Sequence, residues 1–279
     1  MKKREIAKLI RGWKAIDGAG VHLTRVIGNK DVHDFDPFLM LDSFDSIDPS
    51  DYIAGFPMHP HRGIETITYL LSGRIEHEDS LGNKGTIHAG ESQWMTAGSG
   101  ILHQEMPKPA DRMVGFQLWL NLPKHSKMTE PAYLSITRDK IADAMVGRAR
   151  VRVLSGRYGE AQGVTPRHIP ASIFDISLPA GEEVKIDTNP LETVFVFIVE
   201  GNARINGQEI PPKTAVLFDA GEYIEVAAQP DTDLRLCFFS AKALREPVAW
   251  GGPIVMNTQA ELEQAFTELR SGLFIKQHG

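Results

Sequence analysis

The apolar residues of this 279-residue chain fall in short runs separated by Gly, Pro, Asn and Asp. The runs are rich in β-branched and aromatic residues, a composition that favours strands over helices. They comprise Thr66–Leu71, Phe116–Leu120, Ala149–Leu154, Ile173–Leu178, Val194–Val199, Ala215–Phe218 and Leu234–Phe239. Turn signals such as Leu71-Ser72-Gly73 and Asn206-Gly207 stand between them. We therefore predict an all-β protein built from barrels or sandwiches.

Helical patterns are sparse and concentrate near the end of the chain. Thr258 and Glu261 have the spacing of a capping box, and Gly272 suits the end of a helix. Between them, apolar residues repeat at helical spacing at Leu262, Ala265, Phe266 and Leu269. This pattern predicts a short C-terminal helix that docks on the body of the protein. A second, weaker helical segment is predicted from about Arg138 to Val146.

One pattern occurs twice along the chain. The pattern begins at Glu65 and again at Glu192. It consists of a strand that ends in a Gly turn, then a hairpin turn and a further strand. This self-similarity indicates two copies of one barrel, with a boundary near residues 135–150.

The composition is that of an ordinary globular protein, with 42% hydrophobic and 24% charged residues. A net charge of −6 gives no global electrostatic reason to bind nucleic acid or an anionic membrane. No apolar run is long enough to span a bilayer, and the single cysteine, Cys237, excludes an internal disulfide. We expect a cytoplasmic protein, by default a monomer, that binds neither membrane nor nucleic acid directly.

Two pairs of potential metal ligands stand out. His59 and His61 are two residues apart, and so are His103 and Glu105, which follow a Gly-rich turn. Residues at this spacing lie on one side of an extended strand, and a barrel can bring two such strands together. A single histidine pair is more often a surface feature, so the second pair is what indicates a metal site. Three imidazoles and a carboxylate would leave open positions on a six-coordinate ion, which favours a catalytic site.

The motifs around these pairs resemble the pirin family. The resemblance is carried by Phe56–Thr66, His77–Asn83 and Gln93–Met106, and Asp36–Asp42, Gln117–Pro123 and Glu246–Thr258 agree with it. It covers nearly the whole chain and is most specific over residues 36–123.

Resemblance to pirins implies two tandem cupin barrels, which are double-stranded β-helices of the jelly-roll type. We assign residues 1–140 to a metal-binding N-terminal barrel and residues 141–245 to a C-terminal barrel without ligands. Residues 246–279 form a tail and helix that pack back on the barrels. The second barrel has no histidine at the equivalent positions near Lys185–Asn189, so one metal per chain is expected.

The resemblance also implies the ligand set His59, His61, His103 and Glu105, usually with iron. Fe(II) is the expected ion, although Mn, Ni, Cu, Zn and Co suit the same donors. In the general cupin pattern the carboxylate ligand stands where Glu65 is, whereas pirins use the later position, Glu105. We therefore give Glu65 a supporting role.

Four further residues are predicted near the metal or in its pocket. Arg62 follows His61 and either orients an anionic oxygen or forms a structural ion pair, for which Glu65 is one candidate. Phe56, Met58 and Trp94 are candidates for an apolar pocket, and Met58 stands where many pirins carry Asp.

Two functions follow from the resemblance. Some pirins cleave the flavonol quercetin with dioxygen and release carbon monoxide, and here Glu105 would accept the 3-hydroxyl proton as general base. The substrates would then be O2 and a small aromatic molecule, quercetin or a related phenolic. Other pirins are regulatory proteins whose iron controls binding to a transcription factor or a metabolic enzyme. The open ligand set favours the dioxygenase.

Overall fold

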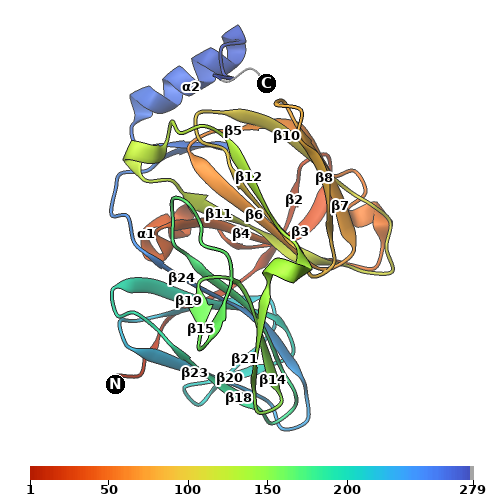
Figure 1. Cartoon of the computed structure of the whole chain (residues 1–279), viewed down its shortest axis with the longest axis vertical. Coiled ribbons are helices and arrows are strands. Elements are labelled where there is room, and N and C mark those ends of the chain that lie inside the picture. The colour runs from red at the N-terminus through yellow and green to blue at the C-terminus, as the bar shows by residue number, and fades with distance from the viewer. Residues whose placement is uncertain (277–279) are drawn as a thin grey trace. The chain divides into compact units, whose positions relative to one another are not determined.

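The computed structural model describes residues 1–276, and within them every apolar run predicted as a strand lies in a strand. The chain forms two compact units (Figure 1). One contains residues 14–32, 38–137 and 244–279, and the other contains residues 1–13, 33–37 and 138–243. The last three residues of the predicted tail, 277–279, lie outside the described part. The prediction of an all-β protein is confirmed.

The first of these units is a barrel of two antiparallel sheets. Its seven-stranded sheet has the order β12-β9-β6-β11-β4-β3-β2, and its four-stranded sheet has the order β5-β10-β7-β8. The strands are β2 (Trp13–Asp17), β3 (Val21–Ile27), β4 (Phe38–Ser46), β5 (Phe56–His61), β6 (Ile64–Ser72), β7 (Arg74–Asp79), β8 (Lys84–His88), β9 (Ser92–Thr96), β10 (Ile101–Pro107), β11 (Met113–Asn121) and β12 (Ala132–Ile136).

The second unit repeats this arrangement. A seven-stranded sheet, β1-β22-β19-β24-β17-β14-β13, is accompanied by a four-stranded sheet, β18-β23-β20-β21, and by the β15-β16 hairpin. The strands are β1 (Ile6–Arg11), β13 (Ala142–Val146), β14 (Ala149–Ser155), β15 (Arg157–Tyr158), β16 (Ala161–Gln162), β17 (Ser172–Leu178), β18 (Glu183–Asp187), β19 (Glu192–Glu200), β20 (Ala203–Ile205), β21 (Gln208–Ile210), β22 (Thr214–Phe218), β23 (Tyr223–Ala228) and β24 (Leu234–Lys242). The same seven-plus-four sheet arrangement in both units matches the internal repeat.

The N-terminal segment differs from its predicted placement in the first barrel. Strand β1 pairs with β22, and Leu9 lies opposite Val216. The edge of the second unit's larger sheet therefore takes up the start of the chain, a long-range pairing that local sequence patterns do not encode. A short helix, α1 (Val32–Phe35), also lies mainly in this unit.

The C-terminal helix α2 (Gln259–Ser271) is confirmed together with its signals. The Thr258 hydroxyl accepts a hydrogen bond from the Glu261 amide, and Gly272 ends the helix in the left-handed conformation. Leu262 and Ala265 pack against the hairpin of β25 (Ala249–Gly251) and β26 (Ile254–Met256). The helix and the hairpin belong to the first unit. No helix in the described residues is long and apolar enough to cross a membrane.

The predicted helix from Arg138 to Val146 is wrong. A short 3-10 turn, Arg138–Lys140, is followed by strand β13, which forms a hairpin with β14. Ala142 lies opposite Val153, and a two-residue turn after Val146 closes the hairpin. Pairing with a neighbouring strand outweighs a weak local helical preference.

Candidate metal centre

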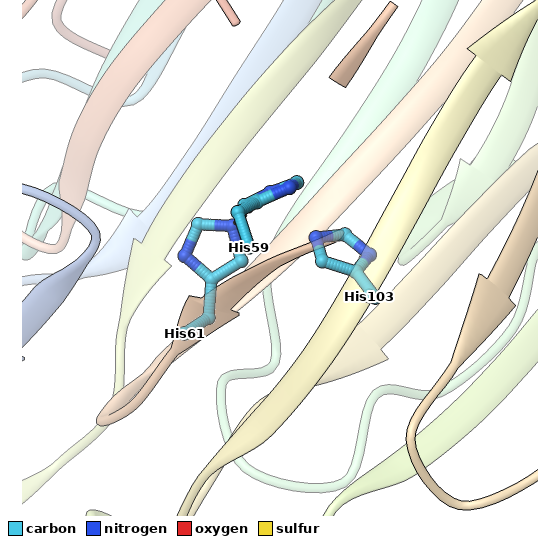
Figure 2. Close-up of side chains that lie close together, drawn as sticks. All are labelled: His59, His61 and His103. Atoms are coloured by element: carbon cyan, nitrogen blue, oxygen red, sulfur yellow. Dashed lines mark hydrogen bonds between the residues drawn. The ribbon is translucent and has the colours of Figure 1, made fainter. Parts of the chain in front are cut away.

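Strands β5 and β10 of the first unit supply the three histidines. They pair antiparallel, with His103 directly opposite His59. Burial alternates along β10, so His103 and Glu105 face the barrel interior together with Ile101. Two strands that neighbour each other only in the folded barrel thus bring the two sequence pairs onto one wall, as Figure 2 shows for the histidines.

The three imidazoles converge on one point (Figure 2). One ring nitrogen from each of His59, His61 and His103 lies within 4.8 Å of the other two. The ring centroids are 4.4 Å apart for His59 and His103 and 5.1 Å apart for His61 and His103. A single ion can therefore contact one nitrogen of each ring after only small side-chain adjustments.

In two of the three rings, a hydrogen bond at Nδ1 leaves Nε2 to point toward the centre of the cluster. Nδ1 of His59 lies 2.9 Å from the carbonyl oxygen of Pro57, and Nδ1 of His61 lies 3.0 Å from that of Pro253. A carbonyl only accepts, so each Nδ1 carries the hydrogen. In the neutral rings the two Nε2 lone pairs then face each other at 3.1 Å. A cation between them removes this repulsion, and a backbone carbonyl behind the ring is a typical support for a metal-binding histidine.

His103 supplies independent evidence that a metal fits. The residue is buried, and neither ring nitrogen has a hydrogen-bond partner among residues 1–276. Burial lowers the pKa of His103 well below its usual value, and the neighbouring histidines add to this effect. Burial also lowers the pKa of His61, to about 3. Burial thus favours the neutral form of the His61 and His103 rings, which is the form that binds transition metals.

Glu105 lies on the same wall but outside the group of three converging nitrogens. Its carboxylate accepts a hydrogen bond of 2.8 Å from the Thr68 hydroxyl and one of 2.5 Å from Nε2 of Gln117. The Gln117 oxygen in turn accepts a hydrogen bond of 3.1 Å from Nε1 of Trp119. These contacts orient a buried carboxylate that shares the inner face of β10 with His103.

Two glycines shape the loops that flank the ligand strands. Gly63, just after His61, has a φ of +78°, and a Cβ there would lie 2.0 Å from the Val255 carbonyl oxygen. Gly98, at the turn before β10, has a φ of +50° and would similarly clash with the Thr129 carbonyl. Both positions need glycine for its conformation and for its small size.

The C-terminal segment packs directly behind the ligand strand. Arg62, adjacent to His61, is buried and pairs with Glu268 of α2 at 2.7 Å. It also donates to the Phe274 carbonyl and stacks on that ring at 4.2 Å. The Val255 amide donates to the Arg62 carbonyl at 3.1 Å. The C-terminal segment thus supports the strand that carries His59 and His61, a role that sequence patterns did not reveal.

Of the five residues predicted around the ligands, Phe56 lines the cavity beside the histidines. Met58 is 46% exposed, and Arg62 binds the C-terminal segment. Side chains alternate between the two faces of β6 from residue 65 to residue 68, so Glu65 and Thr68 lie on opposite faces. Trp94 on β9 pairs with Ile67 and therefore shares the face of Glu65. The predicted ion pair between Arg62 and Glu65 is thus replaced by the pair with Glu268.

Glu65 is buried on that opposite face. It accepts a hydrogen bond of 2.7 Å from the Thr96 hydroxyl, and burial raises the pKa of its carboxyl group. The Glu65 carboxyl group therefore links β6 to β9 on the face of the sheet opposite to that of Thr68.

A cavity of about 620 Å³ opens beside the histidines, within the size range of small-molecule sites. His59 and His61 form part of its wall. The other lining residues are Asp17, Gly18, Ala19, Arg25, Gly28, Asn29, Met40, Asp42, Phe56, Pro57, Gln117, Trp119, Trp250, Gly252 and Pro253. The aromatic and charged lining residues Trp119, Trp250, Arg25 and Asp42 were not singled out from the sequence. Trp119 and Trp250 stand in motifs that carry the pirin resemblance, which was the available signal.

Comparison with known proteins agrees with this architecture. Residues 20–120 match the pirin family, and residues 173–275 match the pirin C-terminal cupin domain. A pirin-like protein from Caulobacter vibrioides is 42% identical over 98% of this chain and 100% of its own length.

Solved structures show the same fold. The crystal structure of a quercetin 2,3-dioxygenase from Acinetobacter baumannii has a TM-score of 0.89 at 31% identity and covers 98% of both chains. The bacterial pirin YhhW from Escherichia coli, in complex with nickel(II), has a TM-score of 0.66 at 24% identity, covering 85% of this chain and 99% of that one. The matched regions include both barrels and all three clustered histidines, and the chain therefore belongs to the pirin family.

Proposed function

We propose that this protein is a metal-dependent dioxygenase that cleaves quercetin or a related flavonol or phenolic with O2. The observation that carries the proposal is the group of three converging histidines beside an aromatic-lined cavity. The quercetin 2,3-dioxygenase of similar fold from A. baumannii supports the choice of reaction. In that reaction both atoms of O2 enter the product, and one ring carbon leaves as carbon monoxide.

Three histidines and one carboxylate would hold the metal. His59, His61 and His103 each offer one ring nitrogen, and Glu105 lies two residues from His103 on the same face of β10. Fe(II) is the proposed ion, and Mn, Ni, Cu, Zn and Co suit the same donors. When bound, the metal supplies the Lewis-acid and redox chemistry that lets a flavonol react with dioxygen.

Glu105 is the proposed general base. Its two oxygens accept hydrogen bonds from Thr68 and Gln117, so the carboxylate is fixed before substrate arrives. A substrate hydroxyl next to this carboxylate can transfer its proton to it, which raises the electron density of the ring to be cleaved. The Gln117 amide, itself held by Trp119, keeps the accepting oxygen in place.

The cavity walls would position the substrate. Phe56, Trp119 and Trp250 present aromatic surface, and the Trp119 and Trp250 rings lie 5.9 Å apart. Flat aromatic side chains pack well against a planar substrate and keep water away from the reacting atoms.

The test is aerobic turnover by protein that has been loaded in turn with Fe(II), Mn(II), Ni(II), Cu(II), Zn(II) and Co(II). Loss of quercetin absorbance and release of carbon monoxide are the readouts, and metal content is measured on the same samples. Glu105→Gln should lower turnover by about 10²–10⁴-fold, and His61→Ala should lose most of the bound metal. The exposed His88, replaced by Ala, is the matched control. Absence of flavonol loss with every metal, in protein that binds one ion per chain, would contradict the proposal.

The regulatory alternative stays a prediction. No specific contact or surface in the described residues favours a protein partner over a small-molecule substrate.

A further inference from the structure

A row of polar side chains runs across the inner face of the first unit's larger sheet. Thr68 lies opposite Gln93 and Gln117, Gln117 lies opposite Asp42, and Asp42 lies opposite Arg25. Residues directly opposite each other in antiparallel strands point to the same face, so the row crosses five strands without a break. Most sheet interiors are apolar, and this row therefore requires an explanation.

The row connects the metal centre with a group of charges. At one end Thr68 and Gln117 bind the Glu105 carboxylate. At the other end Arg25 holds Asp42 in a bidentate pair at 2.9 and 2.7 Å. Gln117 and Arg25 are two strands apart, which is about 10 Å at the usual strand spacing. Gln117, Asp42 and Arg25 all line the cavity.

Asp17 completes the charged end. Its carboxylate accepts a hydrogen bond of 2.6 Å from Nη2 of Arg25 and one of 2.8 Å from the Gly18 amide. Asp17 is half-exposed and lines the cavity, whereas Asp42 is buried beneath Arg25. Nε and Nη2 of Arg25 make these hydrogen bonds, whereas Nη1 makes none to any residue that the structure describes. Nη1 is therefore an available donor, and it lies beside the accessible Asp17 carboxylate, which is an acceptor.

The formal charge of these three residues sums to −1, with one cation against two carboxylates. A negatively charged ligand group would be repelled there, because each carboxylate repels it while only one guanidinium attracts it. A neutral hydroxyl group instead can donate to Asp17, and a neighbouring oxygen can accept from Arg25. Adjacent donor and acceptor groups match two adjacent hydroxyls on an aromatic ring.

We propose that Arg25 and Asp17 form a specificity site for the far ring of the substrate, which they recognise by two neighbouring hydroxyl groups. This proposal rests on the proposed function, because it takes the substrate to be an aromatic molecule with one hydroxyl at the metal centre. It adds a requirement at the opposite end of the cavity. The substrate class is then a neutral, multi-ring phenol. It carries two adjacent hydroxyls about 10 Å, or two strand spacings, from the hydroxyl that reaches Glu105.

Ligand binding without turnover tests this proposal. Full-length protein is loaded with redox-inert zinc and kept anaerobic, and quenching of tryptophan fluorescence reports binding, because Trp119 and Trp250 line the cavity. Two probes are compared: quercetin, and the flavonol that keeps the 3-hydroxyl but lacks both hydroxyls of the outer ring. The ratio of their two Kd values measures recognition of the diol.

Asp17→Asn is the informative variant, because it removes a carboxylate charge without leaving buried Asp42 unpaired. Wild-type protein should bind quercetin at least tenfold more tightly than the other probe, since hydrogen bonds to charged groups are strong. Asp17→Asn should reduce this preference about tenfold and leave the Kd of the second probe unchanged. Asp45→Asn is the matched control, because Asp45 lies on the same strand as Asp42 but pairs with Arg112 and does not line the cavity.

The outcomes separate this proposal from the proposed function. Equal Kd values for both probes, an unchanged ratio in Asp17→Asn, or no binding of either probe would overturn the specificity site. A preserved preference in a protein that does not turn over quercetin with any metal would contradict the dioxygenase only. Turnover without a preference for the diol would contradict the specificity site only.

Discussion

Nδ1 of His61 donates a hydrogen bond of 3.0 Å to the carbonyl oxygen of Pro253, which lies 192 positions further along the chain. Next to this contact, Arg62 binds Glu268 and the Phe274 carbonyl. The orientation of the His61 ring thus depends on a segment far away in sequence. We infer that the C-terminal hairpin and helix stabilise the metal centre as well as the fold.

The pair of Arg62 and Glu268 gives the first prediction. Glu268→Gln should lower the free energy of unfolding by about 1–3 kcal/mol, because the buried guanidinium loses its charged partner. Urea denaturation measures the change. The control is Glu263→Gln on the same helix, where the exposed side chain contacts Gln259 and the change should stay within about 0.5 kcal/mol. Equal effects of the two variants would show that the pair does not support the barrel.

This pair also predicts a pH dependence at acidic pH. Burial opposes the charged form of Glu268, but hydrogen bonds from Lys276, Gln264 and Arg62 outweigh it and lower its pKa from 4.5 to about 2. A lowered pKa means that the unfolded state takes up the proton first, so the stabilisation is complete above pH 4.5 and is lost as the pH falls toward 2. The stability difference between wild type and Glu268→Gln should therefore shrink between pH 4.5 and 2.

Short-range patterns were enough for much of the fold. The strands follow from β-branched runs and turns, and the C-terminal helix follows from the capping box at Thr258 and the stop at Gly272. The helix expected at Arg138–Val146 failed because pairing of β13 with β14 is decided by a neighbour, not by the segment itself.

The candidate site could be predicted from the sequence only where residues that are close in the sequence are also close in space. His59 and His61 share one strand, and His103 and Glu105 share another, so spacing alone indicated both pairs. The pirin resemblance then assigned the two pairs to one site. Arg25 and Asp42 are 17 residues apart and meet through the register of β3 and β4, which no local pattern fixes. The face on which Glu65 lies depends in the same way on the register of β6.

His103 gives the third prediction, which separates metal binding from folding. Its two buried nitrogens have no partner in the described chain, so His103→Leu should leave the metal-free protein equally stable or make it more stable. Wild-type protein should gain about 2.7 kcal/mol at a metal concentration of 100 times Kd, and the variant should gain nothing. Thermal unfolding with and without metal measures both effects. A strongly destabilised metal-free variant would mean that the imidazole has a structural role.

The fourth prediction concerns the support of Glu105. Gln117→Leu removes the amide that binds Glu105 and leaves Nε1 of Trp119 without its acceptor. If Glu105 is a ligand, metal affinity should fall about 10–100-fold, as is usual when a residue behind a ligand is lost. Metal titration with a competing chelator gives the affinity. Thr96→Val is the control, since Thr96 binds Glu65 on the opposite face of the sheet. Unchanged affinity in Gln117→Leu would argue against Glu105 as the fourth ligand.

Lys127 gives the last prediction, a pH dependence in the neutral to alkaline range. Its buried ammonium group donates to the Gly63 carbonyl, the Asn121 side chain and the Val255 carbonyl at 2.5–2.8 Å. Burial lowers the pKa of Lys127 from 10.5 to about 7, although Glu246 and Glu261 act in the opposite direction. Between pH 7 and 10.5 the unfolded chain therefore binds a proton that the folded protein has lost, so stability rises with pH in this window.

Replacement of this lysine by methionine removes the titrating group and makes the effect measurable. The free energy of unfolding of wild type minus that of Lys127→Met should increase by about 1.4 kcal/mol per pH unit at most, from pH 7 to 9. Urea denaturation at pH 7, 8 and 9 measures it, with the exposed Lys124, changed to Met, as the matched control. A difference that does not change over this range would show that the three acceptors keep Lys127 charged despite its burial. The hydrogen bonds from its ammonium group to the Gly63 and Val255 carbonyls would then persist from pH 7 to 9.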